Sequence, residues 1–129
     1  MNNELKPARV LALIPAHNEA ERIGAVIDVV KVHLPVLVVD DGSGDNTSEV
    51  ARQHGAIVVR QEPNQGKGAA LLNGFRYFLG GEYDALLTLD ADGQHDPGEI
   101  PLFLEKYERD RSDLIIGRRD FRKMPFPRN

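Results

Sequence analysis

Short apolar runs alternate with amphipathic stretches along the chain, a pattern that is typical of β-strands alternating with α-helices. Each run is rich in Val, Leu, Ile and Ala without a regular polar position, so it predicts a strand that is buried on both faces. The predicted strands span residues 9–14, 36–39, 56–60, 85–89 and 114–116. We expect Pro15 to end the first strand, because proline has no N–H to donate to a strand ladder.

The stretches between these strands repeat apolar residues every three or four positions, which predicts helices. The predicted helices span residues 19–34, a segment from Asn46 or Thr47 to Gly55, 66–79 and 97–109. We expect polar side chains at their starts to act as caps, Asn18 and Glu19 for the first helix and Asp96 for the last. The third helix should bury one face, made by Ala70, Leu71, Gly74, Phe75 and Phe78.

Strands that are buried on both faces and separated by helices indicate an α/β fold, with a mostly parallel sheet and helices on both of its faces. In such sheets the ligand binds beyond the carboxyl ends of the strands. A polar cluster follows each of the first four predicted strands, in chain order AHNEA, DDGSGD, NQGKG and DADGQHD. We therefore expect the four clusters to converge on one rim of the sheet.

Composition narrows the function classes only a little. A chain of 129 residues forms about one domain, and a net charge of −4 gives no general reason to expect nucleic-acid binding. The absence of cysteine excludes disulfides and thiolate metal sites. We find neither an apolar signal core nor an apolar run near the roughly 18 residues of a membrane span, so we expect a soluble, cytoplasmic chain. Residues 117–129 carry five basic side chains against one acid, which on composition alone is compatible with a solvated tail.

Asp90 and Asp92 stand one residue apart, directly after a predicted strand. If the extended geometry continues through Ala91, their side chains point the same way. Two carboxylates with open positions beside them suit Mg²⁺ or Mn²⁺ held jointly with a substrate diphosphate, and Gln94 would supply a third, neutral ligand. The alternative is a solvated turn whose acids cap the next helix, and for an isolated pair of acids this alternative is the stronger one. An EF-hand is excluded, because the loop has His95 where that motif needs glycine.

Two further clusters allow both a functional and a structural interpretation. Asp40 and Asp41 could accept from a base N–H or a ribose hydroxyl, although turn chemistry and helix capping explain the same residues equally well. Gly66 and Gly68 leave backbone N–H groups bare at a predicted helix N-terminus beside Lys67, which makes an anion site. A glycine-rich loop with an exposed lysine is the alternative, and the Walker A pattern is not met.

The clusters acquire more meaning from their order. IPAHNEA, VVDDGSGDNT, NQGKGAALLNGF, LDADGQHDP and IIGRRD follow one another along the chain. In this order they resemble the family 2 glycosyltransferases of the GT-A type, from about Val10 to the last residue. The branch with the strongest resemblance is that of the dolichyl- or polyprenyl-phosphate sugar synthases, on LDADGQHDP and the closing R-x(5)-P-x-x-R-N stretch. The resemblance implies a GT-A, Rossmann-like fold and inverting, metal-dependent transfer of a sugar. The donor would be a nucleotide-sugar of the GDP-mannose or UDP-glucose type, and the acceptor a polyprenyl phosphate or a glycan.

The resemblance also implies roles for individual residues. His17 stands where many relatives have tyrosine, and Gly-Arg-Arg stands where the family has Gly-Ser-Arg. Asp41, with Val39 beside it, matches the residues that hold the base or ribose, and Asp92 would support the leaving diphosphate through the metal. The implied metal ligands are Asp90, Asp92 and Gln94. The implied nucleotide-sugar-binding residues are Pro15, His17, Glu19, Val39, Asp41, Lys67, Asp90, Ala91, Asp92, Arg119 and Arg128.

Family members continue well beyond position 129 with an acceptor-facing half and the acid that serves many of them as general base. We expect this chain to be the nucleotide-sugar-binding portion, with membrane association only peripheral or through the absent part, at the inner face of the membrane. Two alternatives stay open. One is a nucleotide-binding or regulatory module without turnover. The other is a nucleotidyltransferase, although PAHNEA lacks the Gly-rich, Arg- and Lys-bearing loop that such enzymes carry after their first strand.

Overall fold

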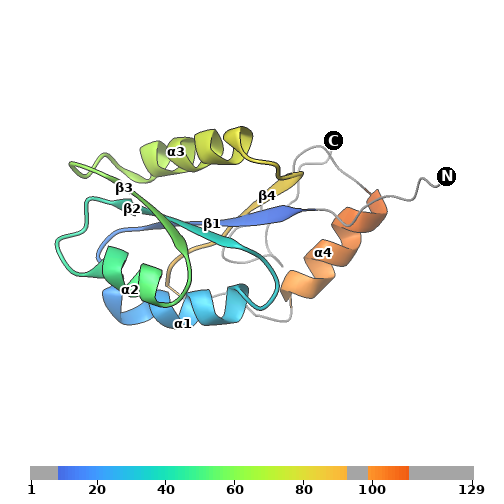
Figure 1. Cartoon of the computed structure of the whole chain (residues 1–129), viewed down its shortest axis with the longest axis horizontal. Helices are drawn as coiled ribbons and strands as arrows, with labels where there is room; N and C mark the ends of the chain where they lie inside the picture. The colour runs from blue at the N-terminus through green and yellow to red at the C-terminus, as the bar shows by residue number, and fades with distance from the viewer. Residues whose placement is uncertain (1–8, 93–98, 111–129) are drawn as a thin grey trace.

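The computed structural model describes residues 9–92 and 99–110, in which strands and helices alternate along the chain (Figure 1). The predicted fifth strand at 114–116 lies outside these residues. The elements are β1 (Val10–Ala16), α1 (Ala20–Val30), β2 (Val36–Asp41), α2 (Thr47–Gln53), β3 (Ile57–Gln61), α3 (Lys67–Gly80), β4 (Ala85–Thr88) and α4 (Glu99–Asp110).

The four described strands form one sheet in the order β3-β2-β1-β4, and every neighbouring pair is parallel. In the register of this sheet Ile14 of β1 lies opposite Val38 of β2, and Leu13 lies opposite Thr88 of β4. α3 covers one face, while α1 and α2 cover the other (Figure 1). The predicted α/β class, with a parallel sheet between two layers of helices, is confirmed.

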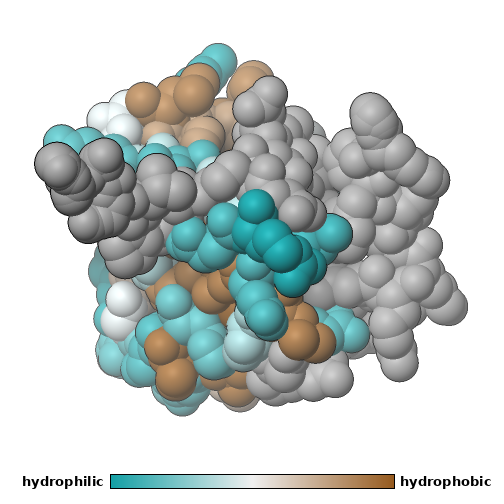
Figure 2. Space-filling model, turned by 90° about the vertical axis from the view of Figure 1, so that its right-hand side faces the viewer, coloured by the Kyte–Doolittle hydropathy of each residue, from teal (hydrophilic) through white to brown (hydrophobic). Residues whose placement is uncertain are grey.

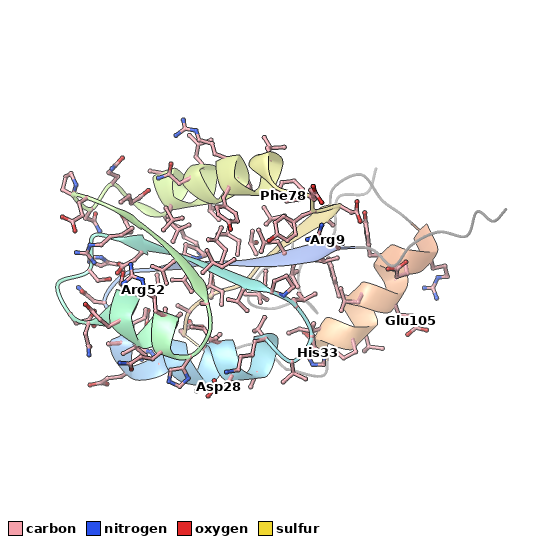
Figure 3. The ribbon with its side chains drawn as sticks, in the orientation of Figure 1. Arg9, Asp28, His33, Arg52, Phe78 and Glu105 are labelled. Carbon is pink, nitrogen blue, oxygen red and sulfur yellow. The ribbon has the colours of Figure 1, made fainter. Side chains whose placement is uncertain are left out.

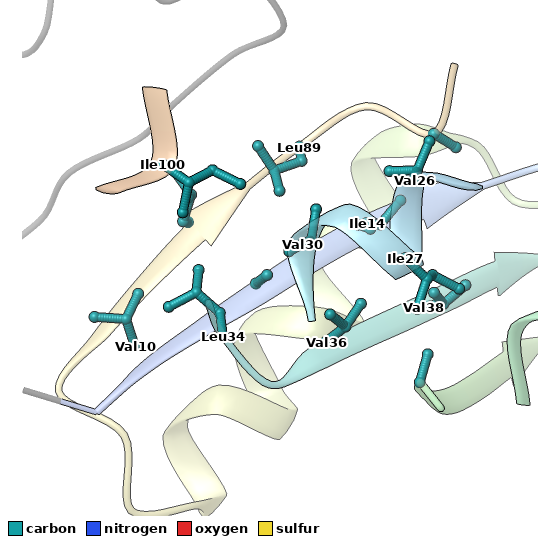
Figure 4. Close-up of a cluster of buried hydrophobic side chains, with 14 of the residues drawn as sticks. Val10, Ile14, Val26, Ile27, Val30, Leu34, Val36, Val38, Leu89 and Ile100 are labelled. Atoms are coloured by element: carbon teal, nitrogen blue, oxygen red, sulfur yellow. The ribbon is translucent and has the colours of Figure 1, made fainter. Parts of the chain in front are cut away.

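The core consists of two clusters, one on each face of the sheet, because successive strand residues point to opposite faces. On the first face Ile14 packs in one cluster with Ile27 of α1 and Ile100 of α4 (Figure 4). On the second face Leu13 belongs to a cluster against which Phe75 of α3 packs. Both faces of β1 and β2 are buried, which explains the apolar sequence of these central strands, whereas the edge strand β3 exposes Ile57 and Arg60.

α3 lies close against β1 at Gly74. A Cβ atom at this position would lie 2.4 Å from Leu13 Cδ2, well inside van der Waals contact. The absence of a side chain at Gly74 therefore sets how near the helix approaches the sheet. The predicted buried face of this helix is confirmed, with Ala70 and Gly74 buried and Leu71, Phe75 and Phe78 packed against the second core.

The prediction that Pro15 ends the first strand is wrong, since β1 continues through it to Ala16. The carbonyl of Leu13 points toward β4, where it accepts from the Leu89 N–H at 2.9 Å. Two residues later the Pro15 nitrogen points to the same side, but β4 has already ended at Thr88. The missing N–H therefore costs no ladder hydrogen bond, as for a proline at a sheet edge.

Two predicted boundaries also differ from the structure. β2 extends past Val39 to include Asp40 and Asp41, whose side chains find hydrogen-bond partners within the fold. α1 ends at Val30 instead of continuing to Leu34, because the chain tightens into a turn there, in which the His33 N–H bonds to the Val30 carbonyl three residues back at 2.9 Å. The turn buries Leu34 and brings the chain into β2.

The amino ends of β1 and β4 lie at the end of the sheet that is opposite to the carboxyl ends of the strands. Hydrophilic and hydrophobic residues are mixed on the described surface there (Figure 2). A hollow of about 400 Å³ at this end is lined partly by Arg9 and Arg76. The Arg9 guanidinium lies over the Tyr83 ring, 5.3 Å from its centroid. No helix among residues 9–92 and 99–110 has both the length and the apolar character needed to cross a bilayer.

Candidate functional site

The carboxyl ends of all four described strands open onto one cavity of about 440 Å³. Each of the four polar clusters contributes to its wall, so the predicted convergence on one rim is confirmed. β1 and its following loop supply Pro15, Ala16, His17 and Glu19, and β2 supplies Asp41. The segment from β3 into α3 supplies Asn64, Gly66, Lys67 and Ala70, and the turn after β4 supplies Asp90, Ala91 and Asp92.

The Asp41 carboxylate anchors the loop between β3 and α3. Its Oδ1 accepts from the Gln61 Nε2 at 2.8 Å and from the Gln65 N–H at 2.7 Å, and its Oδ2 accepts from the Gly66 N–H at 2.9 Å. Burial opposes ionisation of this carboxyl, but the three hydrogen bonds and the nearby His17 outweigh burial and lower the pKa of Asp41. An ionised Asp41 is thus built into the wall of the cavity.

The loop between β3 and α3 approaches β2 closely at Gly42. This residue has a φ of +66°, in the left-handed region that favours glycine. A Cβ there would lie 2.6 Å from the Asn64 backbone nitrogen and 3.0 Å from its Cα. Since both neighbours are backbone atoms, only glycine allows the two segments to lie this close.

The His17 ring is held in place despite its exposure. Its Nδ1 lies 2.8 Å from the Asp41 carbonyl oxygen, to which a protonated Nδ1 donates, and the Asn64 amide donates to the same carbonyl at 3.0 Å. The Nε2 then accepts from the Asn18 amide at 3.2 Å. Its position on the cavity wall is therefore determined by its own neighbour Asn18 and by two other segments of the rim, the end of β2 and the loop before α3.

Asp40 has a structural environment that differs from that of Asp41. It is fully buried, and its carboxylate accepts from the Ser43 N–H at 3.0 Å and from the hydroxyl groups of Ser43 and Ser48. Arg60 also donates to it at 2.9 Å. Consecutive strand residues point to opposite faces, so Asp40 ties together the loop after β2 while Asp41 faces α3.

The loop after β2 also caps α1. The Glu19 N–H donates to Thr47 Oγ1 at 3.0 Å, and the Ala20 N–H donates to Asp45 Oδ2 at 3.2 Å. Glu19 makes no side-chain cap bond for α1, so the predicted cap at this position is wrong, and Asn46 makes none for α2. The reason is that Asp45 serves both helices: its Oδ1 accepts from the Thr47 N–H at 3.0 Å.

One side of the cavity carries opposite charges. Lys67 Nζ lies 3.1 Å from Asp90 Oδ1, and the side chains of Lys67 and Asp90 are 64% and 22% exposed. Asp90 and Asp92 line the same cavity, and carboxylate oxygens are the type of ligand that hard divalent cations such as Mg²⁺ or Mn²⁺ prefer. Within residues 9–92 and 99–110 no third His, Cys, Asp or Glu joins them in a group that could hold a metal. The predicted third ligand, Gln94, lies outside the described residues.

Among the described residues that were predicted for the site, Val39 does not line the cavity, and Asn64 lines it without having been predicted. Val39 is fully buried in the core beneath α3. Arg119 and Arg128 lie outside the described residues. Asn64 lines the cavity and lies 3.1 Å from the His17 ring, 47 positions away in the chain, a separation at which spacing carries no signal.

The fold and the cavity define an α/β protein with a cavity at the carboxyl rim of a parallel sheet, which is where proteins of this architecture bind their ligands. Residues 12–129 match the family model described as glycosyl transferase family 2, and the chain belongs to that family. The predicted GT-A fold class and the predicted family are both confirmed.

Among curated relatives, the chain is 38% identical to the undecaprenyl-phosphate mannosyltransferase of Micrococcus luteus, over 86% of this chain and 48% of that protein. It is 36% identical to the polyprenol monophosphomannose synthase of Mycolicibacterium smegmatis, over 86% of this chain and 45% of that protein. The chain spans about half the length of the curated relatives it matches.

Among solved structures, glucosyl-3-phosphoglycerate synthase from Mycobacterium tuberculosis in complex with Mn²⁺, UDP and glucosyl-3-phosphoglycerate is similar, with a TM-score of 0.61. The sequence identity is 30%, over 73% of this chain and 37% of that chain. This protein therefore shares its fold with a synthase that has been crystallised with a divalent metal and a nucleoside diphosphate.

Proposed function

We propose that this chain is the donor-binding part of a metal-dependent, inverting glycosyltransferase that transfers a sugar from a nucleotide-sugar to a polyprenyl phosphate. One observation carries the proposal: the carboxyl ends of four strands and the segments that follow them, with Lys67, Asp90 and Asp92, line a single cavity. A nucleotide-sugar is long, partly apolar and doubly charged, so it needs a wall of this mixed composition.

The diphosphate binds on the side of the cavity that holds the charged residues. Asp90 and Asp92, with Gln94 as a third ligand, would hold Mg²⁺ or Mn²⁺, and a divalent ion bound there would supply positive charge against the departing nucleoside diphosphate. Lys67 contributes a further positive charge to the same oxygens, and it must first leave its contact with Asp90. The support comes from the shared cavity and from the similar synthase crystallised with Mn²⁺ and UDP.

The nucleoside binds on the side formed by the ends of β1 and β2. Pro15, His17 and Glu19 line this side and would contact the base or ribose, together with Asp41. The hydrogen bonds on both nitrogens of His17 support a fixed ring that offers its face to a base. Val39 contributes from beneath, through its position in β2.

A lipid phosphate is the acceptor that the relatives favour. The undecaprenyl-phosphate and polyprenol mannose enzymes are 38% and 36% identical to this chain. A phosphate acceptor is already ionised at neutral pH, so it attacks without a strong general base. Arg119 and Arg128 would pair with the phosphate groups of donor or acceptor, since guanidinium groups bind phosphate oxygens in pairs.

Titration calorimetry tests donor and metal binding directly. UDP and GDP are titrated, with and without Mn²⁺, into the wild-type chain, Asp92→Ala and Glu105→Ala; Glu105 is exposed on α4 and lies outside the cavity (Figure 3). We expect one nucleotide to bind in a Mn²⁺-dependent manner, and the binding to be lost in Asp92→Ala alone. If the nucleotide affinity is the same with and without Mn²⁺ and is unchanged in Asp92→Ala, the assignment of a metal–diphosphate site is contradicted.

A further inference from the structure

A chain of side-chain amides connects the middle of α3 to the loop that precedes this helix. The Arg76 Nη1 donates to Asn73 Oδ1 at 3.2 Å, and the Asn73 Nδ2 donates to Gln61 Oε1. The Gln61 Nε2 then donates to Asp41 Oδ1 at 2.8 Å. The carboxylate at the end of this chain also accepts from the N–H groups at positions 65 and 66, as described above.

The direction of every hydrogen bond in this chain is determined by its two ends. Arg76 can only donate, and an ionised Asp41 can only accept. The amides of Asn73 and Gln61 are therefore oriented with each oxygen toward the arginine and each nitrogen toward the carboxylate. Bonds aligned in this way polarise one another, and the bond from Gln61 to Asp41 is shielded from water because Gln61 is only 6% exposed.

We propose that Asn73 and Gln61 are positioning residues, which act through Asp41 to hold the turn at residues 65–66 and so place Lys67 for the diphosphate. This inference rests on the proposed function, because it assumes a nucleoside diphosphate as the ligand. Neither Asn73 nor Gln61 lines the cavity, so neither is assigned a contact with that ligand.

The position of Lys67 in the chain supports this role. It follows Gly66 directly, and Gly66 has a φ of +100°, a conformation with few restraints of its own. The Asp41 carboxylate restrains this turn by binding two successive backbone N–H groups. Without that restraint the backbone of Lys67 would adopt several positions. Binding of a diphosphate would then have to order this segment, and the entropy lost would weaken the binding.

Amide hydrogen exchange tests the restraint without any ligand. The exchange of the Gln65 and Gly66 N–H groups is measured by NMR in the wild type, Asn73→Ala and Gln61→Leu. The matched control is Gln53→Ala, an exposed amide on α2. We call the hydrogen-bonded series from Arg76 through Asn73 and Gln61 to Asp41 the relay. We expect the Gln65 and Gly66 N–H groups to exchange about tenfold faster in Asn73→Ala and Gln61→Leu, whereas the exchange of the Ala20 N–H, which is bonded to Asp45, should not change. Unchanged exchange at residues 65 and 66 would overturn the proposal. Asn73→Asp, which keeps the side-chain size but removes the donor, provides a second variant if Asn73→Ala does not fold.

Ligand titration tests the consequence for the diphosphate. Dissociation constants of UDP and uridine, and of GDP and guanosine, are measured by NMR for the same variants. We expect Asn73→Ala to weaken the binding nucleoside diphosphate about tenfold and to leave its nucleoside unchanged. Equal weakening of nucleoside and nucleotide would overturn the inference, since the relay would then act on the base. If the wild type binds neither UDP nor GDP, the proposed function fails, and the exchange measurement still decides whether the relay holds the turn.

Discussion

Gly42→Ala should destabilise the rim of the cavity through two separate effects. A residue with a side chain at a φ of +66° costs about 1–2 kcal/mol. The new Cβ would also lie 2.6 Å from the Asn64 nitrogen, a backbone atom that no rotamer change can move. Overpacking of this kind costs about 1–3 kcal/mol, while the lower entropy of the unfolded chain returns about 0.4–1 kcal/mol. The expected net loss in the free energy of unfolding is about 1–5 kcal/mol.

Urea denaturation measures this loss, and Gly44→Ala provides a matched control two residues away. A Cβ at Gly44 meets only the Asn18 Oδ1, at 3.9 Å, and its φ is not positive. The control should be as stable as the wild type or slightly more stable, because the same entropy term acts without strain. We also expect Gly42→Ala to bind UDP or GDP more weakly, since the displaced segment leads to Lys67. Equal midpoints for the two variants would refute the reasoning about close approach at Gly42.

Three further predictions concern Gly74 in α3, the dependence of stability on the ionisation of Asp41, and Lys67. Gly74→Ala should lower the free energy of unfolding by about 1–3 kcal/mol through its clash with Leu13, whereas Gly68→Ala, with open space around it, should raise it by about 0.5–1 kcal/mol; thermal melts compare them. The pKa of Asp41 is lower in the folded protein than in the unfolded chain, where it is about 3.9. Its contribution to the free energy of unfolding is therefore present above about pH 3.9 and is lost as the pH falls toward the pKa of the folded state. Urea denaturation between pH 7 and pH 3 should show this loss of stability with acid, and Asp41→Asn should make the dependence on pH weaker. Lys67→Gln should weaken the binding nucleoside diphosphate about tenfold or more in calorimetry, yet leave the melting temperature nearly unchanged because its ion pair with Asp90 is exposed; a large drop in melting temperature would show a structural role instead.

The layered fold could be predicted from the sequence because burial on both faces leaves a local signature. Leu13 and Ile14 face opposite cores, so both must be apolar, and the same holds along every central strand. The prediction that Pro15 ends the first strand is wrong for a physical reason. The effect of this proline depends on where β4 ends, a fact about another strand, and local proline rules do not contain it.

The composition of the cavity wall could also be predicted, but its internal hydrogen bonds could not. The convergence follows from parallel topology, which brings the carboxyl ends of the strands together. The capping of α1 by Asp45 and Thr47 joins residues 25 and 28 positions apart, and the bond from Gln65 to Asp41 spans 24. Such pairs depend on the packing of loops against one another, and the periodicities that reveal helices and strands do not extend to them.

The central claim is that the cavity at the carboxyl rim holds a divalent metal together with a nucleoside diphosphate. Paramagnetic broadening by Mn²⁺ of the amide NMR signals locates such a metal directly. In the presence of UDP or GDP, we predict that substoichiometric Mn²⁺ broadens Asp90, Ala91, Asp92 and Lys67 first. Arg9 and Tyr83, at the opposite end of the sheet, should remain sharp. Broadening that is centred elsewhere, or that is the same with and without nucleotide, would contradict the claim.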